Sequence, residues 1–216
     1  MTALARVGKP GPGPTTNPAT NLATNLARDN ADSAVIAESL HRPERFAAIY
    51  DRYFAEIYRY VAGRLGPDVA DDLAAETFTD AFRKRAQFQP SRGALRPWLY
   101  GIATNLVARH RRVEARRLNA LARADRRATA DDLSDLADQA AARVSAQQLR
   151  KPLAHALAQL SAHDRDVLLL VSLADLSYEE VAAALGIPAG TVGSRLNRAR
   201  RKVRTALDGT ALEEKL

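Results

Sequence analysis

Apolar residues recur at intervals of three and four over most of residues 43–208, and this spacing restricts the chain to amphipathic helices. The clearest stretch is residues 43–65, which Gly66 and Pro67 then end. No stretch alternates apolar and polar residues in the way that a half-buried strand does. The sequence therefore predicts an all-α fold.

The helical pattern falls into two groups, which predict two small helical domains joined by a flexible linker. We expect the first domain over residues 43–117, a linker over 118–148, where apolar residues are mostly Ala, and the second domain over 149–208. Residues 1–42 are expected to form a disordered tail, because Pro, Gly and repeated Thr-Asn pairs interrupt any helical period near its start. A short C-terminal tail is expected over 209–216.

Capping signals refine the expected helices. Asp68 is placed to cap a second helix that runs to about Gln87, and a third helix follows the Pro/Gly/Ser loop at 88–93. In the second domain, Ser177 and Glu180 have the spacing of a capping box that opens a helix.

Composition excludes several classes of function. The chain has 216 residues and no Cys, which excludes a disulfide scaffold, a zinc ribbon and a thiol nucleophile. Its four His form no metal-binding pair, so a zinc hydrolase has no support. There is neither an apolar run long enough for a membrane span nor a secretory signal. We therefore expect a cytoplasmic protein that does not insert into membranes.

The formal net charge is +7, and it is concentrated in two short segments. Residues 109–117 carry +4 and residues 188–208 carry +5, while the rest of the chain is slightly acidic. The alternative explanations are a GC-rich genome, which gives an Ala- and Arg-rich composition, and solvated helix faces. Because the charge is local and lacks acidic partners along the helices, it favours binding to nucleic acid.

Residues 177–200 are typical of a helix-turn-helix. Small residues at 182–184 allow a close helix crossing, Gly186 allows a sharp turn, and Pro188 sits where a new helix starts. The basic second helix is then free to enter a DNA major groove. A helical corner that serves only packing is the alternative, and the charge favours DNA.

The helix after Asp68 is acidic, with Asp72 and Glu76 on the same face. The helix dipole accounts for acids in the first turn, and a basic protein partner would account for Glu76 and Asp80. A recombinase or nuclease that uses these carboxylates is the enzymatic alternative.

In the next helix, Trp98 lies near a basic end. An aromatic ring in this place suits stacking on single-stranded DNA, and it equally suits a position in the hydrophobic core.

Four segments carry a resemblance to a known family: FAAIYDRYFAEIYRYV, DDLAAETFTDAFRKRAQF, LRPWLYGIATNLVARHRR and LSAHDRDVLLLVSLADLSYEEVAAALGIPAGTVGSRLNRARRKV. In this order they resemble a bacterial RNA polymerase sigma factor of the sigma-70 family, in the extracytoplasmic-function (group 4) class. The first three are similar to parts of region 2 and the last to region 4. The resemblance covers about residues 43–208 and implies a factor that directs core enzyme to promoters and promotes open-complex formation.

The resemblance also implies roles for individual residues. Core polymerase, through the clamp of its β′ subunit, would meet the acidic residues Asp71, Asp72 and Glu76. The loop at 88–93 would capture a flipped base of the −10 element, and the melting helix would contribute Trp98, Asn105, Arg109, Arg111 and Arg112. The −35 element would be read by Thr191, Ser194, Arg195, Arg198 and Lys202.

The partners implied by the resemblance are core polymerase, including its β flap, promoter DNA and an anti-sigma factor. The resemblance also implies that the chain is not an enzyme, so we expect no catalytic residue, no metal and no cofactor. A stand-alone helix-turn-helix regulator that never binds polymerase remains the alternative, and the acidic helix argues against it.

Overall fold

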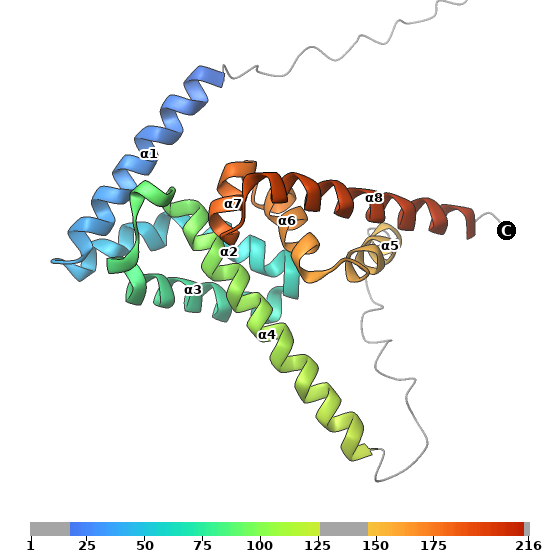
Figure 1. The fold of residues 1–216 in the computed structure, drawn as a ribbon. Helices are drawn as coiled ribbons and strands as arrows, with labels where there is room; N and C mark the ends of the chain where they lie inside the picture. Colours follow the sequence, from blue (N-terminus) through green and yellow to red (C-terminus); the bar gives the residue numbers. More distant parts are fainter. Residues whose placement is uncertain (1–17, 126–146, 214–216) are drawn as a thin grey trace, which may run out of the picture.

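The computed structural model describes residues 18–125 and 147–213, and every regular element in these two ranges is helical (Figure 1). The α-helices are α1 (Pro18–Ser39), α2 (Ala47–Leu65), α3 (Ala70–Lys84), α4 (Leu95–Asp125), α5 (Gln147–Ala158), α6 (Ala162–Leu173), α7 (Tyr178–Leu185) and α8 (Ala189–Glu213). The 3₁₀ turns are η1 (Pro43–Phe46), η2 (Pro67–Val69), η3 (Arg85–Gln87) and η4 (Pro90–Arg92). The all-α prediction is confirmed. None of the described helices has the length and apolar character needed to cross a membrane.

Helices α2, α3 and α4 form the core of the N-terminal half, as their periodicity predicts. Fully buried side chains line their facing sides: Ile49, Ile57, Val61, Ala74, Leu99, Ala103 and Val107. Helix α2 ends at Gly66, whose φ of 90° is a conformation that favours glycine. Asp68 does not cap α3 with its side chain, because it already lies inside the turn η2, and Val69 takes the N-cap position instead.

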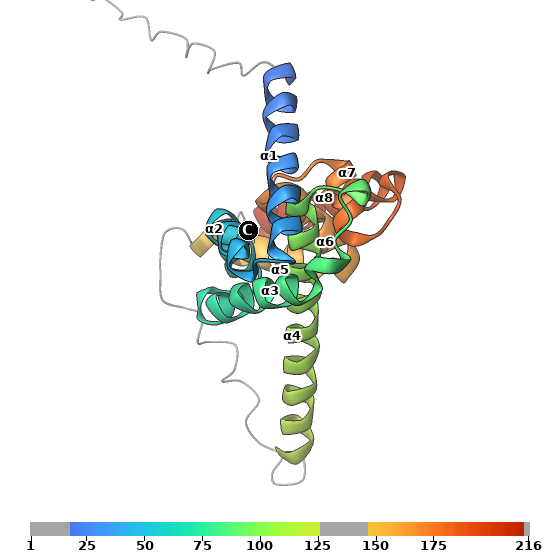
Figure 2. The ribbon, with the colours of Figure 1, turned by 90° about the vertical axis from the view of Figure 1, so that its left-hand side faces the viewer.

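The structure corrects the disordered tail expected over residues 1–42, because α1 occupies Pro18–Ser39 (Figure 2). Tertiary contacts hold this helix. Ile36 is only 3% exposed, and the buried carboxylate of Asp32 accepts hydrogen bonds from Arg52 and from the Tyr53 hydroxyl. The local composition hides the helix, since these partners come from α2, about twenty residues further along the chain. Residues 1–17 lie outside the described residues.

Two further helices extend past their expected ends. Helix α4 continues through residues 118–125 of the expected linker, and α8 continues to Glu213 within the expected C-terminal tail. Residues 118–125 are rich in Ala and Leu, which have high helix propensity and allow α4 to continue. The extension of α8 contains Gly209 and Thr210, which have low helix propensity, so local propensity does not explain why α8 continues. Residues 126–146, which make up most of the expected linker, lie outside the described residues, as do residues 214–216.

The C-terminal half packs α5 to α8 around completely buried side chains: Val167, Leu170, Val181, Val192 and Leu196. The predicted capping box is confirmed. The amide of Glu180 donates to Ser177 Oγ over 3.2 Å, and the amide of Ser177 donates to Glu180 Oε2 over 2.8 Å.

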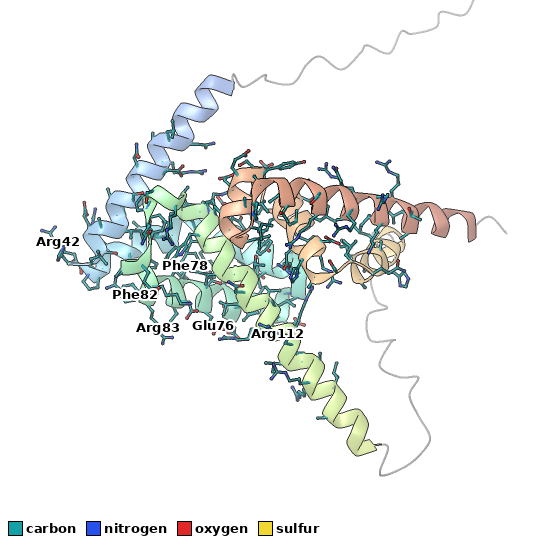
Figure 3. The ribbon with its side chains drawn as sticks, in the orientation of Figure 1. Arg42, Glu76, Phe78, Phe82, Arg83 and Arg112 are labelled. Carbon is teal, nitrogen blue, oxygen red and sulfur yellow. The ribbon has the colours of Figure 1, made fainter. Side chains whose placement is uncertain are left out.

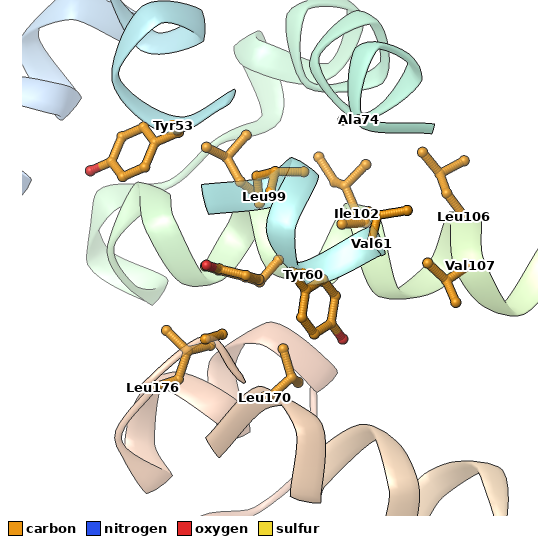
Figure 4. Close-up of a cluster of buried hydrophobic side chains, with 14 of the residues drawn as sticks. Tyr53, Tyr60, Val61, Ala74, Leu99, Ile102, Leu106, Val107, Leu170 and Leu176 are labelled. Carbon is orange, nitrogen blue, oxygen red and sulfur yellow. The ribbon is translucent and has the colours of Figure 1, made fainter. Parts of the chain in front are cut away.

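The two halves share one hydrophobic core. Tyr60 of α2 belongs to the same buried cluster as Leu170 and Leu176 of the C-terminal half (Figure 4). Tyr100 of α4 is part of this cluster as well. Helix α4 runs against α7, and Figure 1 shows these two helices crossing near the middle of the molecule. The two predicted domains are therefore packed on each other in this structure.

Candidate nucleic-acid and protein interfaces

The turn between α7 and α8 has the geometry of a helix-turn-helix. Gly186 ends α7 in the left-handed conformation, with a φ of 63°, and the amide of Ile187 donates to the Ala182 carbonyl over 3.0 Å. Val192 and Leu196 are completely buried and fix α8 on the rest of the C-terminal half. The opposite side of α8 is consequently free to face a ligand.

The residues predicted to read the −35 element lie on one side of α8, because they are spaced by three and four positions. We call this set the recognition stripe: Thr191, Ser194, Arg195, Arg198 and Lys202. Ser194, Arg198 and Lys202 are exposed, and Thr191 and Arg195 are half-buried. Ser194 Oγ donates to the Thr191 carbonyl over 3.0 Å, which satisfies its donor within the helix. The stripe is a cationic surface on one side of a helix, and an α-helix fits the major groove of B-DNA.

Four of the five residues predicted for the melting helix lie on one side of α4. We call them the melting stripe: Trp98, Asn105, Arg109 and Arg112. Asn105, Arg109 and Arg112 are exposed, and Trp98 is half-buried. The structure separates Arg111 from this set, because its guanidinium is half-buried and donates to the Arg64 carbonyl over 2.7 Å. Burial, together with the positive charge of Arg64, lowers the pKa of Arg111.

The loop predicted to capture an unpaired base borders a pocket of about 210 Å³, which we call the loop pocket. It is lined by Gln87, Phe88, Gln89, Arg92, Gly93, Ala94, Trp98 and Ala183. The rings of Phe88 and Trp98 lie 5.3 Å apart between centroids. A pocket with two aromatic rings and one Arg offers a flat base both a stacking surface and a cation near its phosphate.

Helix α3 presents the predicted acidic residues in two different ways. Asp71 and Asp72 are exposed in its first turn. Glu76 instead forms an ion pair with Arg109 of the melting stripe, so its charge is partly neutralised within the molecule. Figure 3 shows Glu76 and Arg83 of α3 along the same edge of the molecule as Arg112 of α4. The acidic and basic surfaces are therefore adjacent in space.

An aromatic row that the sequence did not predict as a surface lies beside α3. The rings of Tyr50 and Phe54 are stacked with centroids 4.8 Å apart, Phe54 and Tyr58 lie 6.3 Å apart, and Phe78 of α3 lies 5.1 Å from Tyr50. Tyr50 is 39% exposed. Tyr50 and Phe54 belong to the apolar stripe of the expected helix 43–65, and Phe78 belongs to that of the next helix, so periodicity alone assigns all three to the core. An exposed aromatic ring beside other aromatic side chains is typical of a surface that binds another protein.

Two family profiles match the chain and divide it as its two halves do. "Sigma-70 region 2" matches residues 49–117, which contain α3 and most of α2 and α4. "Sigma-70, region 4" matches residues 150–203, which contain the helix-turn-helix.

Individual relatives agree with these matches. The chain is 35% identical over 162 residues to the ECF RNA polymerase sigma factor SigL of Mycobacterium tuberculosis, over 74% of this chain and 87% of that protein. It is 36% identical over 142 residues to the ECF RNA polymerase sigma factor SigE of Mycolicibacterium smegmatis, over 64% of this chain and 51% of that protein. The sigma factor RpoE of Bartonella quintana, solved in complex with the anti-sigma factor NepR, has the same fold, with a TM-score of 0.54 at 24% identity over 76% of this chain and 96% of that one. The chain belongs to the sigma-70 family of RNA polymerase sigma factors, in the extracytoplasmic-function class.

Proposed function

We propose that this sigma factor directs core RNA polymerase to a set of promoters by using three separate surfaces. The observation that carries the proposal is the presence, in one chain, of a region 2 and a region 4 that each expose a basic stripe, beside an acidic helix. Basic helices suit DNA, and an acidic helix suits a basic protein partner. Because of these opposite charges, we assign DNA binding to the two basic stripes and polymerase binding to the acidic helix.

Core polymerase would dock on α3 and the neighbouring aromatic row. Asp71 and Asp72 are exposed in the first turn of α3, and Tyr50 supplies exposed apolar area further along this helix, where its ring lies 5.1 Å from that of Phe78. Charged groups of this kind steer the encounter, and aromatic rings supply most of the affinity. The clamp of the β′ subunit is the partner that the family resemblance implies for this surface, and the β flap for region 4.

Promoter DNA would be bound at two places. The recognition stripe of region 4 would read the −35 element as duplex, with Arg195 and Arg198 able to reach guanine edges or phosphates. The melting stripe of region 2 would follow the separated strand, and the loop pocket would hold one unpaired base of the −10 element. Because none of these steps makes or breaks a covalent bond, we propose that the chain acts by binding alone.

Two further proposals concern the compartment in which the chain acts and the protein that inhibits it. The chain would act in the cytoplasm, where core polymerase and the chromosome are. An anti-sigma factor would hold it inactive, which is supported by the bound NepR in the structure of Bartonella quintana RpoE.

In vitro transcription with core polymerase across genomic DNA fragments, followed by mapping of the 5′ ends, tests this function. The expected result is a small set of start sites that appear only when the chain is added. A chain that binds DNA but neither co-purifies with core polymerase nor changes its start sites would instead be a stand-alone regulator. Magnesium-dependent nicking of the fragments would favour the nuclease alternative.

A further inference from the structure

Gly101, on the buried side of α4, lies directly against the end of α7. A β-carbon at this position would stand 2.5 Å from the carbonyl oxygen of Ala184 and 3.3 Å from its carbonyl carbon. Both atoms belong to the backbone, so no side chain can rotate away to make room. Only glycine at position 101 allows region 2 and region 4 to approach this closely.

Buried charges are paired across the same interface. Arg64 of α2 is 8% exposed, and it forms an ion pair with Asp166 of α6. Arg96 of α4 donates from Nη2 to the Ala174 carbonyl over 2.6 Å while its Nε donates to Glu56 over 2.8 Å. Unpaired charges in such places would be strongly unfavourable. Although the Nε of Arg64 is buried without a hydrogen-bond partner, the charge of Arg64 is paired with Asp166 across the interface, as expected for a specific contact.

Region 4 also forms part of the wall of the loop pocket. Ala183 of α7 lines that pocket, and a β-carbon at Gly93, in the loop itself, would lie 3.3 Å from the β-carbon of Ala183. An unpaired strand that enters the pocket must share this space with α7. Asp71 and Asp72 on α3, and Ser194 and Arg198 on α8, remain exposed in the same arrangement.

We infer that the packing of α7 on α4 is an autoinhibitory contact, which restricts access of single-stranded DNA to the loop pocket while it leaves the α3 surface and the recognition stripe accessible. The inference rests on the proposed capture of the −10 element by region 2. Release of α7 from Gly101 opens the pocket. Because the apparent dissociation constant scales inversely with the fraction of open molecules, the free chain binds single-stranded DNA more weakly than an opened variant.

Interdomain distance is the first measurement, and it does not depend on DNA binding. The chain has no Cys, so the substitutions Asp51→Cys and Thr205→Cys, at two exposed positions, allow a spin label to be attached at each of these sites alone. We expect a single narrow distance in the parent and a longer, broader distribution in Gly101→Ala. Gly63→Ala is the matched control, because its β-carbon would meet only a movable methyl group of Leu173, at 3.0 Å.

Asp166→Asn is a second variant that should open the interface, because it removes the carboxylate that pairs with Arg64 between α2 and α6. It provides an independent test if Gly101→Ala folds poorly. Circular dichroism establishes that each variant retains its helices. If both variants keep the parent's distance, the closed state is not held by these contacts and the inference is overturned.

DNA binding is the second measurement, and Gly101→Ala suits it because the net charge is unchanged. Trp98 is the only Trp in the chain and lines the loop pocket, so its fluorescence reports on a base bound there. With a short random-sequence single-stranded DNA, we expect Gly101→Ala to bind roughly tenfold more tightly than the parent, and Gly63→Ala to bind like the parent. An open Gly101→Ala variant with the parent's affinity would overturn the inference. An open variant that binds no single-stranded DNA at all would count against the proposed −10 capture itself.

Discussion

Arg198 of the recognition stripe holds the buried carboxylate of Asp164. Its Nη1 donates to Asp164 Oδ1 over 3.3 Å, and Asp164, in the first turn of α6, is only 2% exposed. The Arg198 side chain is itself half exposed, so it can reach outward from α8 while it neutralises a charge inside region 4. One residue therefore contributes both to the surface predicted for DNA and to the packing of α8 on α6.

Replacement of Arg198 by Ala is expected to have two effects. It should weaken binding to a −35 duplex by about 1–3 kcal/mol, because one charged contact is lost. It should also lower the free energy of unfolding, because Asp164 is left as a buried carboxylate without its partner. Quantitative footprinting and urea unfolding measure the two effects separately.

Arg195→Ala is the matched variant, since Arg195 lies in the same stripe. It is expected to weaken DNA binding with a smaller change in stability. A footprint that is unchanged in both variants would refute the assignment of the recognition stripe.

Reversal of charge on α3 is expected to abolish association with core polymerase. In Asp72→Arg combined with Glu76→Arg, a basic partner meets repulsion in place of attraction, and Arg109 also loses its ion pair with Glu76. Co-purification with tagged core enzyme measures the association. Arg83→Glu, at the exposed C-terminal end of the same helix, is the control and should leave association intact. Retained association of the double variant would count against α3 as the docking surface.

The anchor of α1 predicts a stability effect at a position that lies outside both family matches. Asp32→Ala leaves the buried Tyr53 hydroxyl and the Arg52 guanidinium without their acceptor, which should cost about 1–3 kcal/mol in the free energy of unfolding. Asp51→Ala, at an exposed position of α2, should change it little. Urea unfolding followed by circular dichroism makes the comparison, and equal midpoints for the two variants would show that α1 adds no stability.

Alkaline pH is expected to destabilise the shared core. Burial raises the pKa of Tyr100 from 10.0 to about 12, and burial also raises the pKa of Tyr60 and of Tyr53. An unfolded Tyr loses its proton at lower pH than these do, so stability is intact below pH 10.0 and falls as the pH rises toward 12.

Unfolding midpoints measured across this range should therefore fall, and less steeply in Tyr100→Phe, which has no proton to lose there. The same pH dependence in the parent and in Tyr100→Phe would exclude Tyr100 as a source of the loss.

Much of the helical framework was decided by the sequence alone, because its signals act within a few residues. The apolar period of α2, the end of that helix at Gly66, the capping box of Ser177 and Glu180, and the local charge of α8 are all readable over one or two helical turns. The two stripes follow from the same regularity, since a helix places every third and fourth side chain on one face.

Tertiary structure decided the rest, because it joins residues that are far apart in the chain. Asp32 gains its partners from α2, which turns an expected tail into α1. Helical spacing alone places Arg111 on another side of α4 than the melting stripe, but only the folded chain shows that its partner there is the Arg64 carbonyl.

The approach of Gly101 to Ala184 depends on the shapes of two helices more than eighty residues apart. No local pattern encodes a fit between surfaces at such a separation, so only the folded chain reveals that region 4 rests on region 2.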